Sequence, residues 1–423
     1  ILIHELGHFL AARYFDVRVE TFSFGFGPRL FGFRRGETDF RVSLILFGGY
    51  VKMLGEQPGE GNGDDPRSFL AKPKWQRLII AFAGPFMNIV LAVVLLTGLF
   101  MVKYPVDPED RVPGLIGHVT SGSVADRAGI RPGDRIVEIA GQANPAWDDI
   151  RMKEFTLARK NLEVVIERDG QRIPFTIVPE LDERTGVGNA GWREEEEIQI
   201  AGLLEGMDAE RAGLRPGDTV LSINGRRVRS TATLNEVIQE SGGAPVEIIY
   251  LRDEIRNQIT VTPRLVDMDG ERRYMIGVQL REKVTFTSLS LPAAFAASVE
   301  QNVKGATLIY EFLRGIVERR MSAKSLEGPI RIAQISGDAA REGPDAFVGL
   351  MAMVSLNLAI FNLLPIPILD GGVILLLLVE MIMGRDLSLP VKETVIKVGF
   401  LFLMVVVVFV LYNDLTKVLP AGG

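Results

Sequence analysis

The stretch from Leu78 to Val102 contains no charged side chain, and this feature limits most strongly what the chain can fold into. At about 1.5 Å per residue, a helix of this length exceeds the roughly 30 Å hydrocarbon core of a bilayer. A hydrophobic share of 47% and a mean hydropathy of +0.20 agree with a protein that lies partly in lipid. The stretch therefore predicts a membrane-spanning helix and argues against an ordinary soluble enzyme.

Further apolar runs follow later in the chain. One extends from Ala346 to Leu369, is interrupted by Asp370-Gly371-Gly372 and resumes up to Met383, and another extends from Val398 to Tyr412. Because the chain opens with an apolar Ile1-Leu2-Ile3 and without a methionine, we expect it to begin part-way through an earlier apolar helix. We therefore predict a polytopic α-helical membrane protein with four spans, the first of them incomplete.

Basic side chains gather in two places, between Arg13 and Arg77 and between Arg385 and Lys397. The positive-inside rule predicts that both regions face the cytosol, so the long segment between them lies on the opposite side of the membrane. Over the whole chain, 53 acidic residues exceed 47 basic ones and give a formal net charge of −6. Nothing in this balance indicates nucleic acid as a partner.

An internal repeat occupies the long outer segment. Ala128-Gly-Ile-Arg-Pro-Gly-Asp134 recurs 84 residues later as Ala212-Gly-Leu-Arg-Pro-Gly-Asp218. The short β-rich runs and turns of each copy resemble the PDZ fold, so we expect PDZ domains at 111–182 and 196–266. PDZ domains bind extended peptides at a sheet edge, and the candidate loop for a terminal carboxylate in the first copy is Gly114, Leu115, Ile116 and Gly117. The alternative is that both domains are steric spacers.

The strongest chemical signal lies near the start of the chain, where His4-Glu5-Leu6-Gly7-His8 matches the HExxH pattern in an apolar helical context. Residues four apart share one helix face, so both imidazoles can bind one tetrahedral Zn²⁺. Glu5 then lies beside the metal as a general base that takes a proton from water and returns it to the leaving amine. Cysteine is absent, which excludes thiolate zinc sites and cysteine nucleophiles.

A catalytic zinc needs a third protein ligand, and Ala11 and Tyr14 stand where a metzincin has glycine and histidine. The best candidate is Asp370, because Pro365 and Pro367 before it and two glycines after it break an apolar helix. An aspartate at membrane depth costs about 2.5–3.5 kcal/mol unless a partner such as zinc compensates it. The alternative is an aspartate at a helix end that reaches the membrane interface.

Taken together, these motifs resemble the site-2 protease family over essentially the whole chain. The resemblance is carried by HExxH in a first span, Gly84-Pro85-Phe86-Met87-Asn88 in a second, the broken third span and the PDZ modules. It implies the zinc ligands His4, His8 and Asp370 and the base Glu5. It also implies that Asn362, Pro365 and Pro367 handle the substrate, and that Asn362 helps to stabilise the oxyanion. The alternative role of Asn362 is an interhelical hydrogen bond.

The segment 22–52 resembles the membrane re-entrant β-hairpin of these enzymes. A transmembrane substrate must be unwound before water can attack it, and a strand edge offers new partners for the freed backbone groups where lipid offers none. The candidate substrate-binding residues are therefore Gly48, Gly49, Tyr50 and Val51. The alternative is a structural interfacial hairpin.

The expected organisation has eight parts. They are the end of a first transmembrane helix with HExxH (1–15), a cytosolic-side region with the hairpin (16–75), a second transmembrane helix (76–102), the two PDZ domains, an amphipathic helical region (267–344), a broken third transmembrane segment (345–383) and a fourth transmembrane helix (395–413).

The resemblance implies a zinc-dependent intramembrane endopeptidase of the bacterial inner membrane, with its PDZ domains in the periplasm. The implied substrates are single-span membrane proteins already trimmed outside the membrane, such as an anti-sigma factor, and remnant signal peptides. One alternative is a membrane-anchored PDZ adaptor with structural zinc, against which Glu5 argues, since a structural site needs no base. Another is a metalloprotease that acts on soluble peptides at the cytosolic surface, against which the broken third span argues.

Overall fold

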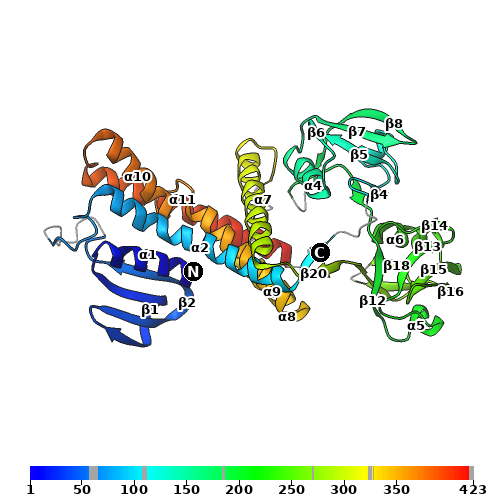
Figure 1. Ribbon diagram of the computed structural model, residues 1–423, viewed down its shortest axis with the longest axis horizontal. Coiled ribbons are helices and arrows are strands. Elements are labelled where there is room, and N and C mark those ends of the chain that lie inside the picture. Colours follow the sequence, from blue (N-terminus) through cyan, green and yellow to red (C-terminus); the bar gives the residue numbers. More distant parts are fainter. Residues whose placement is uncertain are drawn as a thin grey trace. The chain divides into compact units, whose positions relative to one another are not determined.

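The computed structural model describes residues 1–56, 65–106, 112–182, 186–268, 271–322, 326 and 328–418. The chain forms two compact units, each assembled from separate stretches of sequence (Figure 1). The first unit comprises Ile1–Tyr104, Thr287–Glu311 and Leu326–Gly423, and the second comprises Pro105–Phe286 and Phe312–Ser325. The candidate metal ligands and the candidate base belong to the first unit, whereas the repeat belongs to the second.

The first unit is a bundle of helices with one sheet. The helices are α1 (Leu2–Tyr14), α2 (Lys74–Val102), α7 (Leu291–Val317), α8 (Pro329–Glu342), α9 (Pro344–Asn362), α10 (Asp370–Met383) and α11 (Leu389–Val418), and α7 continues into the second unit. Helix α2 contacts α1, α9 and α10, while α8 contacts α9 and α11 (Figure 1). Since α2 touches the helices that carry both halves of the predicted metal site, it is the element that aligns them.

Three of the described helices are long and apolar enough to cross a membrane: Lys74–Val102 in α2, Pro344–Asn362 in α9 and Leu389–Thr416 in α11. Helices α1 and α10 have 13 and 14 residues, fewer than the roughly 20 of a helical span. The predicted third segment is therefore two helices, α9 and α10, joined by the proline-rich stretch that was expected to break it. The total of four spans stays a prediction.

Strands β1 (Val19–Arg35) and β2 (Thr38–Met53) form an antiparallel sheet that packs against α1. Residues 19–24 pair with 49–53, and residues 29–35 pair with 38–43. The strands bend at Gly25 and Gly48, whose φ angles of 90° and 108° lie in the region that glycine tolerates. Many side chains between 24 and 46 are large, apolar and exposed, as a hairpin in lipid requires. Its re-entrant position in the membrane stays a prediction.

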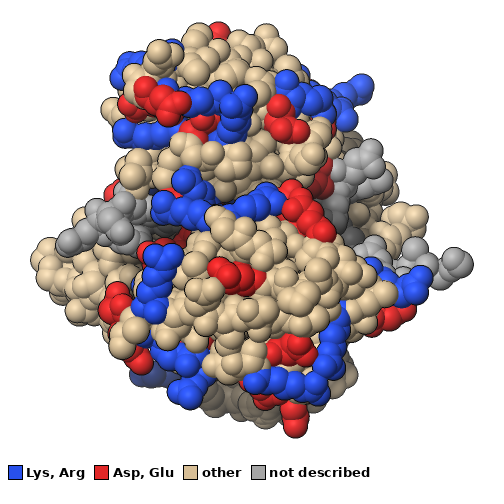
Figure 2. Space-filling view, turned by 90° about the vertical axis from the view of Figure 1, so that its right-hand side faces the viewer, with Lys and Arg blue, Asp and Glu red and all other residues tan. Residues whose placement is uncertain are grey.

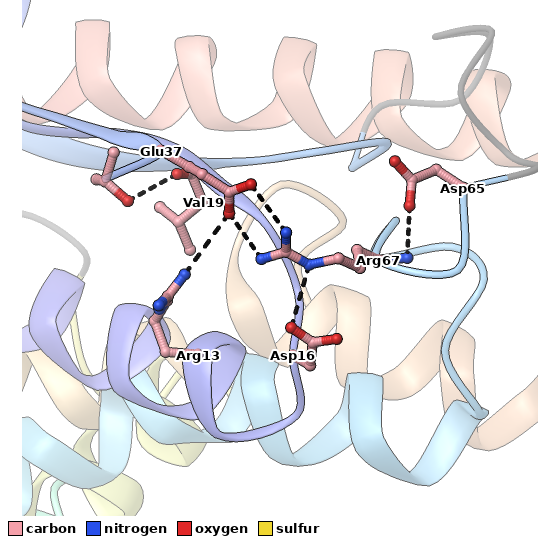
Figure 3. A network of polar contacts seen from close by, with 7 residues as sticks. Arg13, Asp16, Val19, Glu37, Asp65 and Arg67 are labelled. Carbon is pink, nitrogen blue, oxygen red and sulfur yellow. Dashed lines mark hydrogen bonds and ion pairs between the residues drawn. The ribbon is translucent and has the colours of Figure 1, made fainter. Parts of the chain in front are cut away.

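A network of polar contacts ties this sheet to the end of α1 (Figure 3). Arg67 donates hydrogen bonds to the two Glu37 carboxylate oxygens at 2.9 and 2.7 Å and to Asp16 at 3.1 Å. Arg13, in the last turn of α1, lies 3.9 Å from the same Glu37 carboxylate. The turn between β1 and β2 therefore holds both the helix end and the segment that leads into α2.

The second unit contains the repeat as two β-rich domains with matching elements. The first domain has β4 (Ile116–Val119), α3 (Val124–Arg127), β5 (Arg135–Ile139), β6 (Gln142–Ala143), α4 (Trp147–Thr156), β7 (Leu162–Arg168), β8 (Gln171–Ile177), β9 (Glu180–Leu181), β10 (Gly188–Asn189) and β11 (Trp192–Glu194). Its largest sheet has the order β6-β5-β7-β8, while β11 pairs with β4 and β10 with β9.

The second domain has β12 (Ile198–Leu203), α5 (Asp208–Ala212), β13 (Thr219–Ile223), β14 (Arg226–Arg227), α6 (Thr231–Glu240), β15 (Val246–Arg252), β16 (Ile255–Val261), β17 (Arg264–Met268), β18 (Glu271–Met275) and β19 (Val278–Glu282). Its sheet has the order β16-β15-β13-β12-β19, with β14 on β13. Two further strands, β3 (Tyr104–Val106) and β20 (Thr285–Thr287), occupy sequence positions where the chain passes from one unit to the other.

The repeated Gly-Asp motif makes the same contacts in both domains. Arg168 donates two hydrogen bonds of 2.7 Å to the buried Asp134, and Arg252 donates two of 2.7 Å to the buried Asp218. Each carboxylate also accepts a backbone N–H three residues before it. The motif therefore serves to close a turn in each copy.

Both repeat domains extend further than predicted. The first was expected to end at 182 and the second at 266, but β11 pairs with β4 and β19 pairs with β12. Trp192 and Ile276 lie in the two hydrophobic cores. The last strand of each copy pairs with the first strand, and such long-range pairing leaves no local signal in the sequence. The start of the first expected domain, residue 111, lies outside the described residues.

The charges on the face shown in Figure 2 are mixed, with basic side chains beside acidic ones. In the second repeat domain, Arg226 pairs with Glu236 and Glu240 at 3.1 and 2.9 Å. Because these groups are exposed, each pair contributes at most about 1 kcal/mol. The repeat domains therefore depend for their stability on their two apolar cores.

Candidate metal centre

Three side chains of the first unit meet at one point. His4 and His8 come from α1, and Asp370 is the first residue of α10. His4 Nε2 lies 3.2 Å from His8 Nε2 and 3.1 Å from Asp370 Oδ2. His8 Nε2 lies 3.4 Å from Asp370 Oδ1. The structure thus brings together the three residues that the sequence predicts as metal ligands.

The spacing of these three atoms fits a tetrahedral zinc ion. Bonds of about 2.0–2.1 Å at tetrahedral angles separate two ligand atoms by about 3.4 Å, and the distances here are 3.1–3.4 Å. The chemistry of the donors fits as well, because two imidazole nitrogens and a carboxylate are the ligand types that Zn²⁺ binds. Three ligands also leave a fourth position open, as catalytic zinc sites require.

Two contacts from α2 orient the histidines. His8 Nδ1 donates a hydrogen bond of 2.8 Å to the Ile80 carbonyl, so the lone pair of Nε2 faces the point where the ligands meet. The Asn88 side-chain amide lies 3.3 Å from His4 Nδ1. A carboxamide can present either its oxygen or its nitrogen by rotation, so Asn88 can accept the His4 Nδ1 proton and leave Nε2 free for metal.

Two glycines let α1 and α2 approach closely enough for these contacts. A Cβ added at Gly84 would lie 2.2 Å from His8 Nε2 and 2.8 Å from His4 Cε1. A Cβ added at Gly7 would lie 2.2 Å from the Ala83 carbonyl oxygen. The imidazoles therefore occupy the space that a side chain at position 84 would fill.

The loop between α9 and α10 places Asp370 by folding back over the glycine pair. Ile366, between the two prolines, donates its N–H to the Leu364 carbonyl. A Cβ added at Gly371 would lie 2.3 Å from the carbonyl oxygens of Leu363 and Leu364, and one added at Gly372 would lie 2.3 Å from that of Ile366. Only glycine at both positions lets α10 begin directly beneath this loop.

Two further predicted residues lie at the same centre. Glu5 lines a cavity of about 480 Å³ together with the three ligands. Asn362, the last residue of α9, has its amide nitrogen 3.5 Å from His4 Nε2. Both the candidate base and the candidate oxyanion donor therefore lie beside the point where the ligands converge.

The candidate substrate-binding residues divide into two groups. Tyr50, Val51 and Pro367 line the cavity. A Cβ at Gly49 would lie 3.4 Å from Glu5 Cγ, so the Gly49 backbone packs against the candidate base. Two other candidates are not among the described residues that line the cavity. Gly48 packs on the Phe26 ring, and Pro365 is exposed in the loop.

The residues of the candidate peptide loop in the first repeat domain are not among the described residues that line the groove of that domain. Gly114, Leu115, Ile116 and Gly117 lead into β4, and Ile116 is fully buried in the core. A Cβ at Gly117 would lie 2.6 Å from the carbonyl oxygens of Glu194 and Arg229. A groove of about 310 Å³ is instead lined by α4 and β11, with Arg151 and Trp192 among its residues.

The sequence did not reveal what α2 contributes to the site. Gly84 and Asn88 were recognised as part of a motif, but their contacts with the two imidazoles depend on how α2 packs on α1. The four-residue spacing that places both on one helix face was the available signal. Arg77, seven residues before Gly84, lines the same cavity, and nothing in the sequence indicated that position.

Comparison with known proteins agrees with this geometry. The family model described as "Peptidase family M50" matches residues 1–406. The chain belongs to peptidase family M50. This is the family of the site-2 proteases, so the resemblance drawn from the motifs is confirmed. The prediction of a metalloendopeptidase from HExxH is confirmed as well.

Relatives of this M50 peptidase align along nearly their full length. A "Putative zinc metalloprotease" of Treponema pallidum is 33% identical over 433 residues, which cover 98% of this chain and 96% of that protein. One of Vibrio cholerae is 29% identical, with 99% and 96% covered. The "Regulator of sigma-E protease RseP" of Salmonella typhimurium is 28% identical, also with 99% and 96% covered. The names of the first two agree with the predicted zinc cofactor.

Among solved structures, the PDZ domain of an SdrC-like protein from Listeria monocytogenes covers 21% of the M50 peptidase and 90% of its own chain. The sequence identity is 20% and the TM-score is 0.19.

Proposed function

We propose that this M50 peptidase is a zinc-dependent intramembrane endopeptidase that cleaves single-span membrane proteins. The observation that carries the proposal is the convergence of His4 and His8 with Asp370, in a bundle whose helices α2 and α9 have membrane-spanning length. Ionisable side chains within a membrane cost free energy, so where they occur they mark a functional site. A peptidase centre built there acts on peptide bonds that lie within the bilayer.

The catalytic roles follow from the geometry of the centre. His4, His8 and Asp370 would hold the zinc, which when bound supplies the Lewis acidity that lowers the pKa of water toward 7 and polarises the scissile carbonyl. Glu5 lines the same cavity, so its carboxylate can take a proton from the attacking water and deliver it to the leaving amine. Asn362 can donate its amide N–H toward the developing oxyanion.

The sheet beside α1 supplies a place for an unwound substrate. Residues 49–53 pair with residues 19–24, and no second partner strand is found for them among the described residues. Tyr50 and Val51 on this segment line the cavity. A peptide that adds to this free edge as a further strand would have its backbone groups satisfied and its scissile bond beside the metal. This supports Gly48 to Val51 as the substrate-binding segment.

The cellular setting is part of the same proposal. The excess of basic residues between Arg13 and Arg77 supports a cytosolic location for that region, with the repeat domains in the periplasm of a bacterial inner-membrane protein. The Salmonella relative is named a regulator of sigma-E protease, which supports an anti-sigma factor as a substrate, with remnant signal peptides as a second class. The repeat domains would act as PDZ domains that exclude untrimmed ectodomains or bind a peptide end.

The test compares wild type with Glu5→Gln on a model single-span substrate in detergent, with bound zinc measured in both. Glutamine keeps the size of the side chain but cannot take the proton, so zinc stays bound and cleavage falls by about 100- to 10,000-fold. His4→Ala is the matched control, which loses zinc and cleavage together. Normal cleavage by Glu5→Gln would contradict the role of Glu5 as the base. If zinc-loaded wild type cuts no membrane-embedded peptide, the alternative of a membrane-anchored PDZ adaptor with structural zinc is favoured.

A further inference from the structure

The cavity at the metal centre has a second polar end. Arg77, Glu380 and Lys392 line it together with the metal ligands. Glu380 is 1% exposed, and its Oε1 accepts hydrogen bonds from Lys392 Nζ at 2.6 Å and from the Leu387 N–H at 2.9 Å. Its Oε2 accepts none from the described residues. The negative charge of Glu380 is therefore already balanced by one cation, Lys392.

Two carboxylates, Glu380 and Asp386, act on Arg77 through space, but each already forms an ion pair with a lysine. The Arg77 side chain is 6% exposed, and its buried Nε finds no hydrogen-bond acceptor within the part of the chain that the structure describes. Its guanidinium lies 5.3 Å from the centre of the Phe69 ring, which holds it in place without neutralising it. A buried, unpaired cation is costly. A negatively charged group that entered the cavity would relieve that cost.

The lysines near this end already have partners of opposite charge. Lys74 is paired with Asp386 at 2.7 Å. Glu56 also lines the cavity, but its side chain is exposed, so water and salt screen its charge from the buried Arg77. Arg77 also lies in the first turn of α2, where the positive end of the helix dipole adds to its charge. The cavity end at Arg77 is therefore suited to an anion.

The position of Arg77 along α2 sets how far its backbone lies from that of Gly84, which packs on the metal-binding imidazoles. Gly84 faces the two imidazoles, and Arg77 precedes it by seven residues, or two turns on the same helix face. The rise between them is about 10 Å at 1.5 Å per residue. An extended peptide covers that distance with about three residues at 3.3 Å each.

We propose that Arg77 binds a carboxylate of the substrate and so selects peptides that carry one about three residues from the scissile bond. The inference rests on the proposed peptidase function, because a peptide cut at the metal centre must occupy the cavity that Arg77 lines. The carboxylate can come from an Asp or Glu side chain or from a free chain end. Both present the same planar acceptor to the guanidinium.

The test is an acid scan of a model single-span substrate. Each position within six residues of the scissile bond is changed in turn to Glu or Gln, and kcat/KM is compared within each pair. Wild type is expected to favour Glu by about tenfold or more at one position and by little elsewhere. A second set of peptides ends at that position with a free carboxylate or with an amide, which separates a chain end from a side chain.

Variants of Arg77 then assign the preference. The ratio for Glu over Gln should fall toward one in Arg77→Gln, persist in reduced form in Arg77→Lys and fall below one in Arg77→Glu, where two carboxylates would repel each other. Lys397→Gln, which removes an exposed cation paired with Glu393, is the matched control and keeps the wild-type ratio. Bound zinc, measured in every variant, reports whether the centre is still assembled.

Several results would overturn the inference. If wild type cleaves the substrate but shows the same kcat/KM for Glu and Gln at every position, the carboxylate site at Arg77 is refuted. The proposed peptidase function is not affected by that result. A wild-type ratio in Arg77→Gln would place the preference elsewhere. A ratio that appears only in vesicles with anionic lipid would make Arg77 a lipid phosphate site instead. Failure of zinc-loaded wild type to cut any substrate would refute the proposed function itself.

Discussion

Replacement of Gly84 by alanine is the sharpest test of how the metal centre is assembled. The added Cβ would lie 2.2 Å from His8 Nε2 and 2.6 Å from His8 Cε1. Non-bonded contacts need about 3.5 Å or more, so the ring must move by about 1 Å. His8 cannot turn aside freely, because its Nδ1 donates to the Ile80 carbonyl on the same helix as Gly84.

A movement of this size exceeds what a zinc site tolerates. Ligand distances in zinc sites hold to about 0.2 Å, and the loss of a group that only orients a ligand already costs 10- to 100-fold in affinity. We therefore expect Gly84→Ala to lower zinc affinity by at least about 100-fold. The measurement is competition for zinc against a chelator of known affinity, with helix content followed by circular dichroism to show that the bundle stays folded.

A matched control lies on the same helix. A Cβ at Gly98 would meet nothing within 4 Å, so Gly98→Ala should keep wild-type zinc affinity while it raises helix propensity by about 1 kcal/mol. If Gly84→Ala bound zinc as tightly as Gly98→Ala does, α1 and α2 would be free to separate. The close packing of the two helices would then not determine the geometry of the site.

Three further predictions concern the loop and the repeat domains. Gly371→Ala puts a Cβ 2.3 Å from two backbone carbonyl oxygens, so the loop must open and the same chelator competition should show loss of zinc. Asp218→Ala removes a buried acceptor of Arg252 and should destabilise the second repeat domain by about 1–2 kcal/mol, because the released Arg252 can be solvated; hydrogen exchange over 198–282 measures this. Burial raises the pKa of Glu154 to about 7, against which its hydrogen bonds from Ala190 and Trp192 act. Between pH 4.5 and 7, Glu154 keeps its proton in the native state but loses it in the unfolded state. The free energy of unfolding of the first repeat domain should therefore fall by about 3 kcal/mol as pH rises through that range, and no further above it. Hydrogen exchange of the two domains in the full chain checks this, because the second domain has Ile238 at the matching position and should show no such change.

The sequence alone determined those features that depend on local spacing. The interval between His4 and His8 is one helical turn, so their shared face follows from helix geometry in any fold. Pro365, Pro367 and the following glycines break a helix wherever they occur, and the structure has α9 end and α10 begin around them. The repeat was likewise visible, because its turns reuse the same residues at a constant offset.

The tertiary structure decided which distant segments meet. The approach of Asp370 to the histidine pair depends on how α1 and α10 pack on α2, and the sequence could offer Asp370 only as a candidate. The same packing gives Gly84 and Arg77 their surroundings. The closing strands β11 and β19 also escaped prediction, because strand pairing joins residues far apart in the chain. Local periodicity sets the direction in which a side chain points, but only packing sets what it meets.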